Sequence, residues 1–188
     1  HAVLVTRDLV GDEPFAVILA DDVIDAEPTA LEQMIEAFGQ VGGPVLAVER
    51  VPADQVSRYG IVAVEADEGL PPGVCRVTDL VEKPAQKDAP SNLAIIGRYI
   101  LTPDIFPELE ATASDRTGEI QLTNGLRRLL RRRPLFSCEI RGTRHDTGNK
   151  QGYLRAVVYF ALRRPDLAAD FAEYLRSLDL DRIVAPAP

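Results

Sequence analysis

The sequence predicts an α/β protein in which one mostly parallel, mixed sheet lies between helices, and three observations favour this class. Residues 15–20 form a nearly unbroken apolar run, which is typical of a strand buried on both faces in a helix-covered parallel sheet. Runs of this kind alternate along the chain with segments of helical periodicity. No internal repeat or long linker divides the 188 residues. We therefore expect a single domain over residues 1–180 and a frayed tail over 181–188.

The first elements follow from spacing and capping signals. Ala2, Val5 and Leu9 share a helical face that Gly11 ends. The strand over residues 15–20 comes next. Thr29-Ala30-Leu31-Glu32 is a capping-box pattern, so a helix is expected to start there and to end at Gly39.

The remaining elements alternate between strands and helices. Strands are expected over residues 45–51, 61–65, 75–82, 93–101 and 135–140. Helices are expected from Thr102, over residues 120–132, around Leu154 to Leu162, and after Asp166. Because residues 45–101 are rich in strands and poor in helices, we expect part of the sheet to be antiparallel.

Composition excludes several classes of partner. The chain is 46% hydrophobic and 27% charged, and its net charge is −8. This balance argues against a nucleic-acid or anionic-membrane surface. No apolar run approaches the ~20 residues of a membrane helix, so a cytoplasmic protein is expected. Cys75 and Cys138 match no metal or redox spacing and are expected to be reduced, buried thiols.

Two adjacent carboxylates, Asp21 and Asp22, follow the first apolar strand. Ligands of α/β sheets gather at the carboxyl ends of strands. Mg²⁺ takes one or two protein carboxylates and completes its shell with water and phosphate oxygens. The pair is therefore a candidate Mg²⁺ site, and the alternative is that the two acids start a turn and cap the next element.

Glu82-Lys83-Pro84 is a second candidate. The residue before a proline is disfavoured in the helical region, so Lys83 is expected to be extended, with Glu82 and Lys83 pointing to opposite sides. A carboxylate can accept from sugar hydroxyls, and an ammonium can neutralise a phosphate. The alternative is a solvated ion pair at the end of a strand.

A third candidate surrounds Asp146, which follows the strand at residues 135–140 and could face Asp21 across a shared Mg²⁺. The alternative for Asp146-Thr147-Gly148 is a turn or helix cap, and His145 alone is more typical of a packed histidine. Glu119 lies at a helix start, where it could meet a hydroxyl or only complement the helix dipole.

Taken together, these segments resemble the bacterial UTP–glucose-1-phosphate uridylyltransferases of the sugar-nucleotidyltransferase family. The resemblance runs from His1 to about Asp170. It is carried by the blocks His1-Ala2, Leu19-Ala20-Asp21-Asp22, Arg58-Tyr59-Gly60, Val81-Glu82-Lys83-Pro84, Pro90-Ser91-Asn92-Leu93-Ala94, Gly97-Arg98-Tyr99, Gly118-Glu119-Ile120-Gln121-Leu122-Thr123, and the nine residues from Asp146 to Leu154.

The resemblance implies a Rossmann-like nucleotidyltransferase fold and the reaction of UTP with glucose 1-phosphate to give UDP-glucose and pyrophosphate. It implies Mg²⁺ on Asp21 and Asp146, and Lys83 on the sugar phosphate. The glucose site would be lined by Gly60, Glu82 and Glu119, with Asn92 and Gly97 nearby, and His1 would lie beside the uracil ring. A homodimer or homotetramer is also implied.

This sequence departs from the family in two ways. Asn124 and Asn149 stand where the family usually has Asp, and neither is a proposed ligand. The first strand and the glycine-rich loop that cradles the triphosphate would lie before His1, so we expect an N-terminally truncated chain that is inactive alone. The alternatives are a thymidylyltransferase on the same sugar phosphate and a non-catalytic sugar-nucleotide-binding module.

Overall fold

The computed structural model describes residues 1–114 and 118–183. The chain divides into two compact units, with the boundary between Arg144 and His145. The predicted single domain over residues 1–180 stays a prediction. Of the predicted tail, residues 181–183 belong to a short helix, and residues 184–188 lie outside the described residues.

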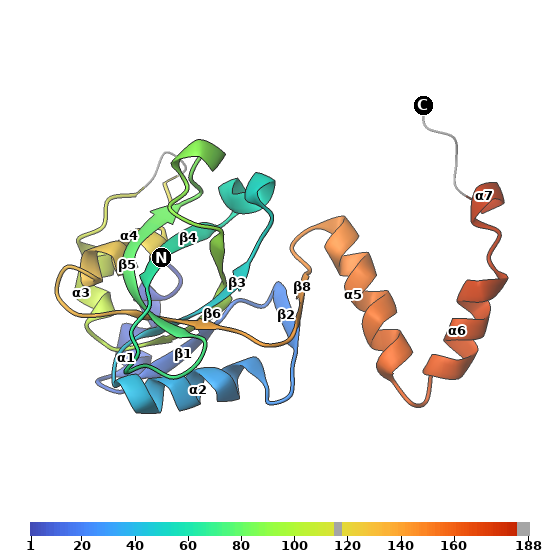
Figure 1. Ribbon diagram of the computed structural model, residues 1–188, viewed down its shortest axis with the longest axis horizontal. Helices are drawn as coiled ribbons and strands as arrows, with labels where there is room; N and C mark the ends of the chain where they lie inside the picture. Colours follow the sequence, from blue (N-terminus) through green and yellow to red (C-terminus); the bar gives the residue numbers. More distant parts are fainter. Residues whose placement is uncertain (115–117, 184–188) are drawn as a thin grey trace. The chain divides into compact units, whose positions relative to one another are not determined.

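A six-stranded mixed sheet forms the centre of the first unit (Figure 1). Its order is β1 (Phe15–Ile18), β6 (Leu93–Leu101), β3 (Val45–Arg50), β7 (Phe136–Glu139), β5 (Val74–Glu82) and β4 (Gly60–Glu65), and β4 also pairs with β6. In the described part of the chain, β3 and β7 are the one parallel pair of this sheet.

The mixed α/β fold is therefore confirmed, but the expectation of a mostly parallel sheet is wrong. A parallel connection needs a crossover of a dozen residues or more, usually through a helix. The loop over residues 66–73 is too short for that, so β4 and β5 run antiparallel. The antiparallel portion expected within residues 45–101 extends to most of the sheet.

Strand β1 also differs from its predicted form. It lies at the edge of the sheet, and its side chains alternate between half-buried and exposed. Phe15 stacks on Phe106 with ring centroids 5.3 Å apart, whereas Ile18 is exposed. The apolar run at residues 15–20 is therefore not buried on both faces, because one of the two faces of β1 is exposed.

Helices cover both faces of the sheet. Alternate residues of β3 enter two different clusters, Leu46 and Val48 on one side and Val45 and Ala47 on the other. Helices α3 (Ile105–Glu110) and α4 (Leu122–Leu129) supply the first cluster, and α2 (Ala30–Val41) supplies the second. This arrangement is the expected α/β sandwich.

Helix α2 shows how local signals set its bounds. The Thr29–Glu32 capping box is present, with the Thr29 N–H donating to the Glu32 carboxylate at 2.8 Å. The helix continues past Gly39, the predicted end, and stops at Gly42, whose φ of +63° is left-handed. Gly39 keeps helical geometry, so the more distant glycine is the cap.

Shorter elements complete the first unit. They are η1 (Leu4–Thr6), α1 (Arg7–Val10), η2 (Ala53–Arg58), η3 (Gln86–Asp88) and β2 (Asp22–Asp25), which pairs with β8 (Thr143–Asp146), the strand in which the unit boundary falls. Helix α1 ends at Gly11 as predicted. Cys75 and Cys138 are free thiols as expected, but only Cys138 is buried and Cys75 is half-buried.

The second unit consists mainly of helices. They are α5 (Lys150–Arg163), α6 (Ala168–Ser177) and α7 (Leu180–Ile183), and α5 begins at an N-cap formed by Asn149. None of the helices in the described ranges is long and apolar enough to cross a membrane.

Candidate functional site

The chain turns sharply where β1 ends. The Asp22 N–H donates to the Leu19 carbonyl at 3.3 Å, which places Ala20 and Asp21 at the centre of a β-turn. The Leu19 N–H donates to the Gly97 carbonyl of β6 at 2.8 Å. Asp21 is exposed, whereas Asp22 is buried. The two adjacent carboxylates, which looked equivalent in sequence, therefore occupy different environments.

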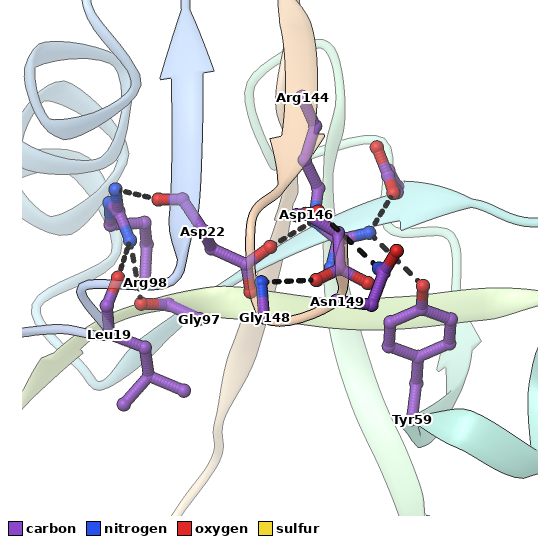
Figure 2. A network of polar contacts seen from close by, with 10 residues as sticks. Leu19, Asp22, Tyr59, Gly97, Arg98, Arg144, Asp146, Gly148 and Asn149 are labelled. Carbon is purple, nitrogen blue, oxygen red and sulfur yellow. Dashed lines mark hydrogen bonds and ion pairs between the residues drawn. The ribbon is translucent and has the colours of Figure 1, made fainter. Parts of the chain in front are cut away.

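Asp22 is held by a buried arginine, Arg144 (Figure 2). The Arg144 Nε lies 2.5 Å from Asp22 Oδ1, and its Nη1 lies 2.7 Å from Glu49 Oε1 and 3.4 Å from the Tyr59 hydroxyl. The guanidinium also lies over the Tyr59 ring, 5.0 Å from its centroid. The side chains of Arg144 and Asp22 are only 9% and 11% exposed, so this is an interior ion pair.

The protonation of Arg144 follows from these contacts. Burial alone would lower the pKa of the guanidinium, but the hydrogen bonds to Asp22 and Tyr59 and the charge of Asp22 raise it above its ordinary value. Arg144 is therefore a permanent cation opposite two carboxylates, Asp22 and Glu49.

A second arginine, Arg98, holds the backbone of the same turn. Its Nη1 donates to the Leu19 carbonyl at 2.8 Å and to the Gly97 carbonyl at 3.1 Å, and its Nη2 donates to the Asp22 carbonyl. Burial lowers the pKa of Arg98, although Asp22 and Asp21 act in the opposite direction. Arg98 thus binds three carbonyl oxygens that lie around Asp21.

Gly97 of β6 packs directly against this turn. Its φ is +63°, and a Cβ there would lie 2.6 Å from Asp22 Oδ2 and 3.1 Å from the Leu19 Cβ. Only glycine can adopt this positive φ and leave room for Asp22 and Leu19 without strain. The structure therefore places Gly97, a residue predicted near the sugar, directly against Asp22.

The predicted sugar residues Gly60 and Glu82 lie opposite each other on β4 and β5. A Cβ on Gly60 would lie 3.2 Å from Glu82 Oε2 and 2.8 Å from Thr123 Oγ1. The missing side chain at Gly60 thus keeps space beside the Glu82 carboxylate. Thr123, on α4, is a neighbour of this space that the sequence analysis did not single out.

Lys83 does not have the predicted conformation. Its φ is +45°, so it is left-handed rather than extended, and its N–H donates to the Tyr59 carbonyl at 2.9 Å. Its Nζ lies 3.7 Å from Glu82 Oε1, so the two side chains approach each other rather than pointing to opposite sides. The backbone hydrogen bond at the end of β5 outweighs the local preference of a residue before proline.

The other predicted residues of the first unit lie in two places: Asn92 lies beside Val51, and His1 and Glu119 lie near the start of α4. Asn92 is exposed, and its amide donates to the Val51 carbonyl at 3.3 Å. Glu119 is exposed and accepts from Gln121 Nε2 at 3.2 Å, before α4 begins. The terminal ammonium of His1 donates to the Ile120 carbonyl at 3.2 Å, so His1 and the segment around Glu119 lie together.

Asp146 lies in the second unit and is described there by itself. Its carboxylate accepts from the Gly148 N–H at 3.0 Å, which is an Asx-type turn, and Asn149 accepts from the Gly152 N–H at 2.9 Å. His145 packs against the ring of Tyr159, with centroids 4.3 Å apart. The turn and the packed histidine are thus present, and the metal role of Asp146 stays a prediction.

Four residues of the network were not foreseen as a group: Glu49, Tyr59, Arg98 and Arg144. Tyr59 and Arg98 lie inside blocks that carry the family resemblance, and Arg144 precedes Asp146 by two residues. Those positions are the signal that could have drawn attention to them. Their pairing could not be read, since Arg144 and Asp22 are 122 residues apart in the chain.

Comparison with known proteins defines the class. The model of the family described as nucleotidyl transferase matches residues 1–161. The chain therefore belongs to the nucleotidyl transferase family. It is 36% identical over 180 residues to a UTP–glucose-1-phosphate uridylyltransferase of Staphylococcus epidermidis and 38% identical over 178 residues to one of Bacillus subtilis. These alignments cover 96% and 95% of this chain but 62% and 59% of the relatives, so the chain spans about three fifths of their length.

Solved structures agree with this class. A UDP-glucose pyrophosphorylase complexed with UDP-glucose is 43% identical and has a TM-score of 0.82, over 87% of this chain and 62% of that one. A UTP-bound enzyme from Acinetobacter baumannii is 34% identical with a TM-score of 0.81, over 95% and 61%. A thymidylyltransferase structure from Bacillus anthracis, at 24% identity, shares the fold.

Proposed function

We propose that this protein transfers a uridylyl group from UTP to glucose 1-phosphate in an Mg²⁺-dependent reaction, giving UDP-glucose and pyrophosphate. The observation that carries the proposal is the 36–39% identity, over 95–96% of this chain, to relatives named for that activity. The similar structure that holds UDP-glucose supports the same substrate class.

The sugar side of the proposal rests on the ends of β4 and β5. Glu82, kept accessible by Gly60, would accept hydrogen bonds from glucose hydroxyls, and Lys83 beside it would bind the sugar phosphate. Asn92, Gly97 and Glu119 complete the proposed glucose side. His1, next to Ile120, would lie beside the uracil ring.

The metal side of the proposal rests on Asp21 and Asp146. Among the described residues there is no cluster of three or more His, Cys, Asp or Glu side chains able to hold a metal. Asp21 and Asp146 would each supply one carboxylate, and water and phosphate oxygens would complete the shell of the ion. When bound, Mg²⁺ would neutralise charge on the reacting phosphates. Asp21, exposed on its turn, has the donor type that this ion prefers.

The proposed chemistry is a direct displacement. A phosphate oxygen of glucose 1-phosphate attacks the α-phosphorus of UTP, and the bond from that phosphorus to the bridging oxygen of pyrophosphate breaks. Lys83 would offset the negative charge of the attacking phosphate, and no covalent enzyme intermediate forms. Catalysis would come from positioning and electrostatic stabilisation.

The test is turnover of the complete gene product with UTP or dTTP, glucose 1-phosphate and Mg²⁺, followed by pyrophosphate release. We expect UTP to be preferred and EDTA to abolish the reaction. A tenfold preference for dTTP would replace the proposal with thymidylyl transfer. Binding of UDP-glucose without any turnover would indicate the non-catalytic module. Uracil and thymine differ by one methyl, worth ~1–3 kcal/mol in a pocket, so partial use of dTTP is expected.

We also propose that the protein is a cytoplasmic homodimer or homotetramer, as the family resemblance implies. Light scattering of the complete gene product at micromolar concentration tests the assembly. A monomeric mass would contradict it.

A further inference from the structure

We propose that Arg144 is a positioning residue that fixes the Asp21 turn and the Tyr59–Gly60 segment in one arrangement. The inference rests on the proposed function, because Asp21 and Gly60 belong to its metal and sugar sides. The proposed function above assigns no role to Arg144 itself. Its own evidence is a set of contacts within the first unit.

The first step is the link from Arg144 to the turn. Asp21 is exposed and lies at the centre of a turn whose last residue is Asp22. The buried Asp22 carboxylate is the side chain by which the turn is anchored, and Arg144 Nε binds it at 2.5 Å. Without that cation, Asp22 would be a carboxylate buried without its charge partner, which is costly. The orientation of Asp21 therefore depends on Arg144.

The second step is the link to the sugar side. The same guanidinium contacts the hydroxyl and the ring face of Tyr59. The Tyr59 carbonyl accepts from the Lys83 N–H at 2.9 Å, and the next residue, Gly60, lies opposite Glu82. Arg144 thus touches the segment that holds Lys83 and Glu82.

The third step concerns geometry. Nε and Nη1 of Arg144 bind two carboxylates that come from different strands, Asp22 of β2 and Glu49 of β3. A planar guanidinium presents donors in fixed, divergent directions, whereas an ammonium is a point charge. Lysine at this position would keep the charge but could not reproduce both contacts and the stacking on Tyr59. This separates a positioning role from simple charge balance.

The experiment compares Arg144→Gln and Arg144→Lys with Arg50→Gln as a matched control. Arg50 also binds a carboxylate through two nitrogens: its Nε and Nη2 donate to the two carboxylate oxygens of Glu139 at 3.0 and 3.2 Å. Both of these side chains are well exposed. Hydrogen exchange of the Leu19 and Asp22 amides reports on the turn without any assay of activity. Exchange of the amides that join β3 and β7 reports on the integrity of the sheet.

We expect both Arg144 variants to exchange the Asp22 amide at least tenfold faster than wild type, with the sheet amides unchanged and with Arg50→Gln like wild type. In the complete gene product, both should raise the Mg²⁺ concentration for half-maximal turnover and the KM for glucose 1-phosphate by about tenfold. Adding Asp22→Asn to Arg144→Gln should cause no further loss of function and should recover part of the stability, because the contact between the two residues is already absent and asparagine leaves no unpaired buried charge.

Three results would overturn the inference: wild-type exchange at Leu19 and Asp22 in Arg144→Gln, full function in Arg144→Lys, or additive effects of the two changes. If Arg144→Gln fails to fold, Arg144→Lys carries the same test. Failure of the proposed function would appear differently, as a wild-type protein without turnover in which the exchange effect of Arg144→Gln persists.

Discussion

The Leu19–Asp22 turn and the end of β5 at Glu82 and Lys83 both present charged side chains, but they are held in different ways. The turn is fixed by the buried ion pair of Arg144 with Asp22, by Arg98 and by the missing side chain of Gly97, although Asp21 itself is exposed. The end of β5 is held by its pairing with β4, by a backbone hydrogen bond from Lys83 to Tyr59, and by an ion pair of 3.7 Å whose lysine side chain is 57% exposed.

This difference separates residues that stabilise the backbone of the site from exposed residues that are proposed to bind substrate. Interior ion pairs destabilise a protein strongly when one partner is removed, by ~3–5 kcal/mol. Exposed pairs contribute ~0–1 kcal/mol. Changes of the buried residues Arg144, Asp22 and Gly97 should therefore affect stability together with function, whereas changes of the exposed Asp21 and Lys83 should affect function with little effect on folding.

The largest expected effect is at the proposed metal carboxylates. Asp21→Asn and Asp146→Asn should each lower Mg²⁺-dependent turnover by ~10²–10³. The unfolding midpoint of Asp21→Asn should stay near that of wild type because its carboxylate is exposed, whereas Asp146→Asn should keep the fold with a modest loss of stability, because Asp146 is half-buried and accepts from the Gly148 N–H. Rates at several Mg²⁺ concentrations, with denaturant unfolding, measure both. Asp12→Asn, at an exposed loop residue, is the control.

Asp22→Asn sharpens this contrast. From the sequence it is expected to be much milder than Asp21→Asn, because only the first acid aligns with the metal position of the family. The structure adds a stability cost, since Arg144 loses one of its two carboxylates. Near-normal turnover and Mg²⁺ dependence in Asp146→Asn, with a loss of both in Asp22→Asn, would contradict the metal assignment.

Gly97→Ala should be strongly destabilising. The methyl would lie 2.6 Å from Asp22 Oδ2 on a backbone with φ of +63°, so overpacking and strain together should cost ~2–4 kcal/mol of unfolding free energy. Gly39→Ala is the matched control, because its methyl would meet nothing within 4 Å inside α2. The control should stabilise by ~0.5–1 kcal/mol. Urea unfolding of both variants tests the opposite signs.

Gly60→Ala tests the sugar side of the comparison. Its methyl would crowd Glu82 Oε2 at 3.2 Å and Thr123 Oγ1 at 2.8 Å. We expect the KM for glucose 1-phosphate to rise by roughly tenfold, which is ~1.4 kcal/mol, with a smaller effect on the KM for UTP. Thr123→Ala in the same chain removes the closer contact and should restore stability without restoring the KM. An unchanged KM in Gly60→Ala would remove Glu82 from the proposed site.

Local signals in the sequence predicted local structure well. The capping box at Thr29 and the turn at Gly11 are present, and the carboxylate pair does follow β1. Sheet direction was less accessible, because β1 is paired and covered by residues far away in the chain. The same holds for Arg144, whose partner Asp22 lies 122 residues earlier. No short-range pattern in the sequence encodes such a pair, so the pair could be recognised only in the tertiary structure.

Lys83 shows a different failure of sequence-based prediction, in which tertiary structure overrides a local conformational preference. The preference of a residue before proline is worth little beside a strand-end hydrogen bond to Tyr59, which turns Lys83 towards Glu82. Sequence reasoning therefore named two neighbouring residues whose side chains approach each other, but it predicted the wrong directions for them, and their binding roles stay predictions.

The smallest expected effect tests this left-handed backbone directly. Lys83→Gly and Lys83→Ala both remove the ammonium, so the lost ion pair cancels in their comparison. At φ of +45° the glycine variant should be more stable than the alanine variant by ~1 kcal/mol. At Val81, an ordinary position of β5, glycine should instead be the less stable by ~0.5–1 kcal/mol. Urea unfolding of the four variants gives both differences, and a more stable alanine variant at position 83 would contradict the left-handed conformation and with it the approach of Lys83 to Glu82.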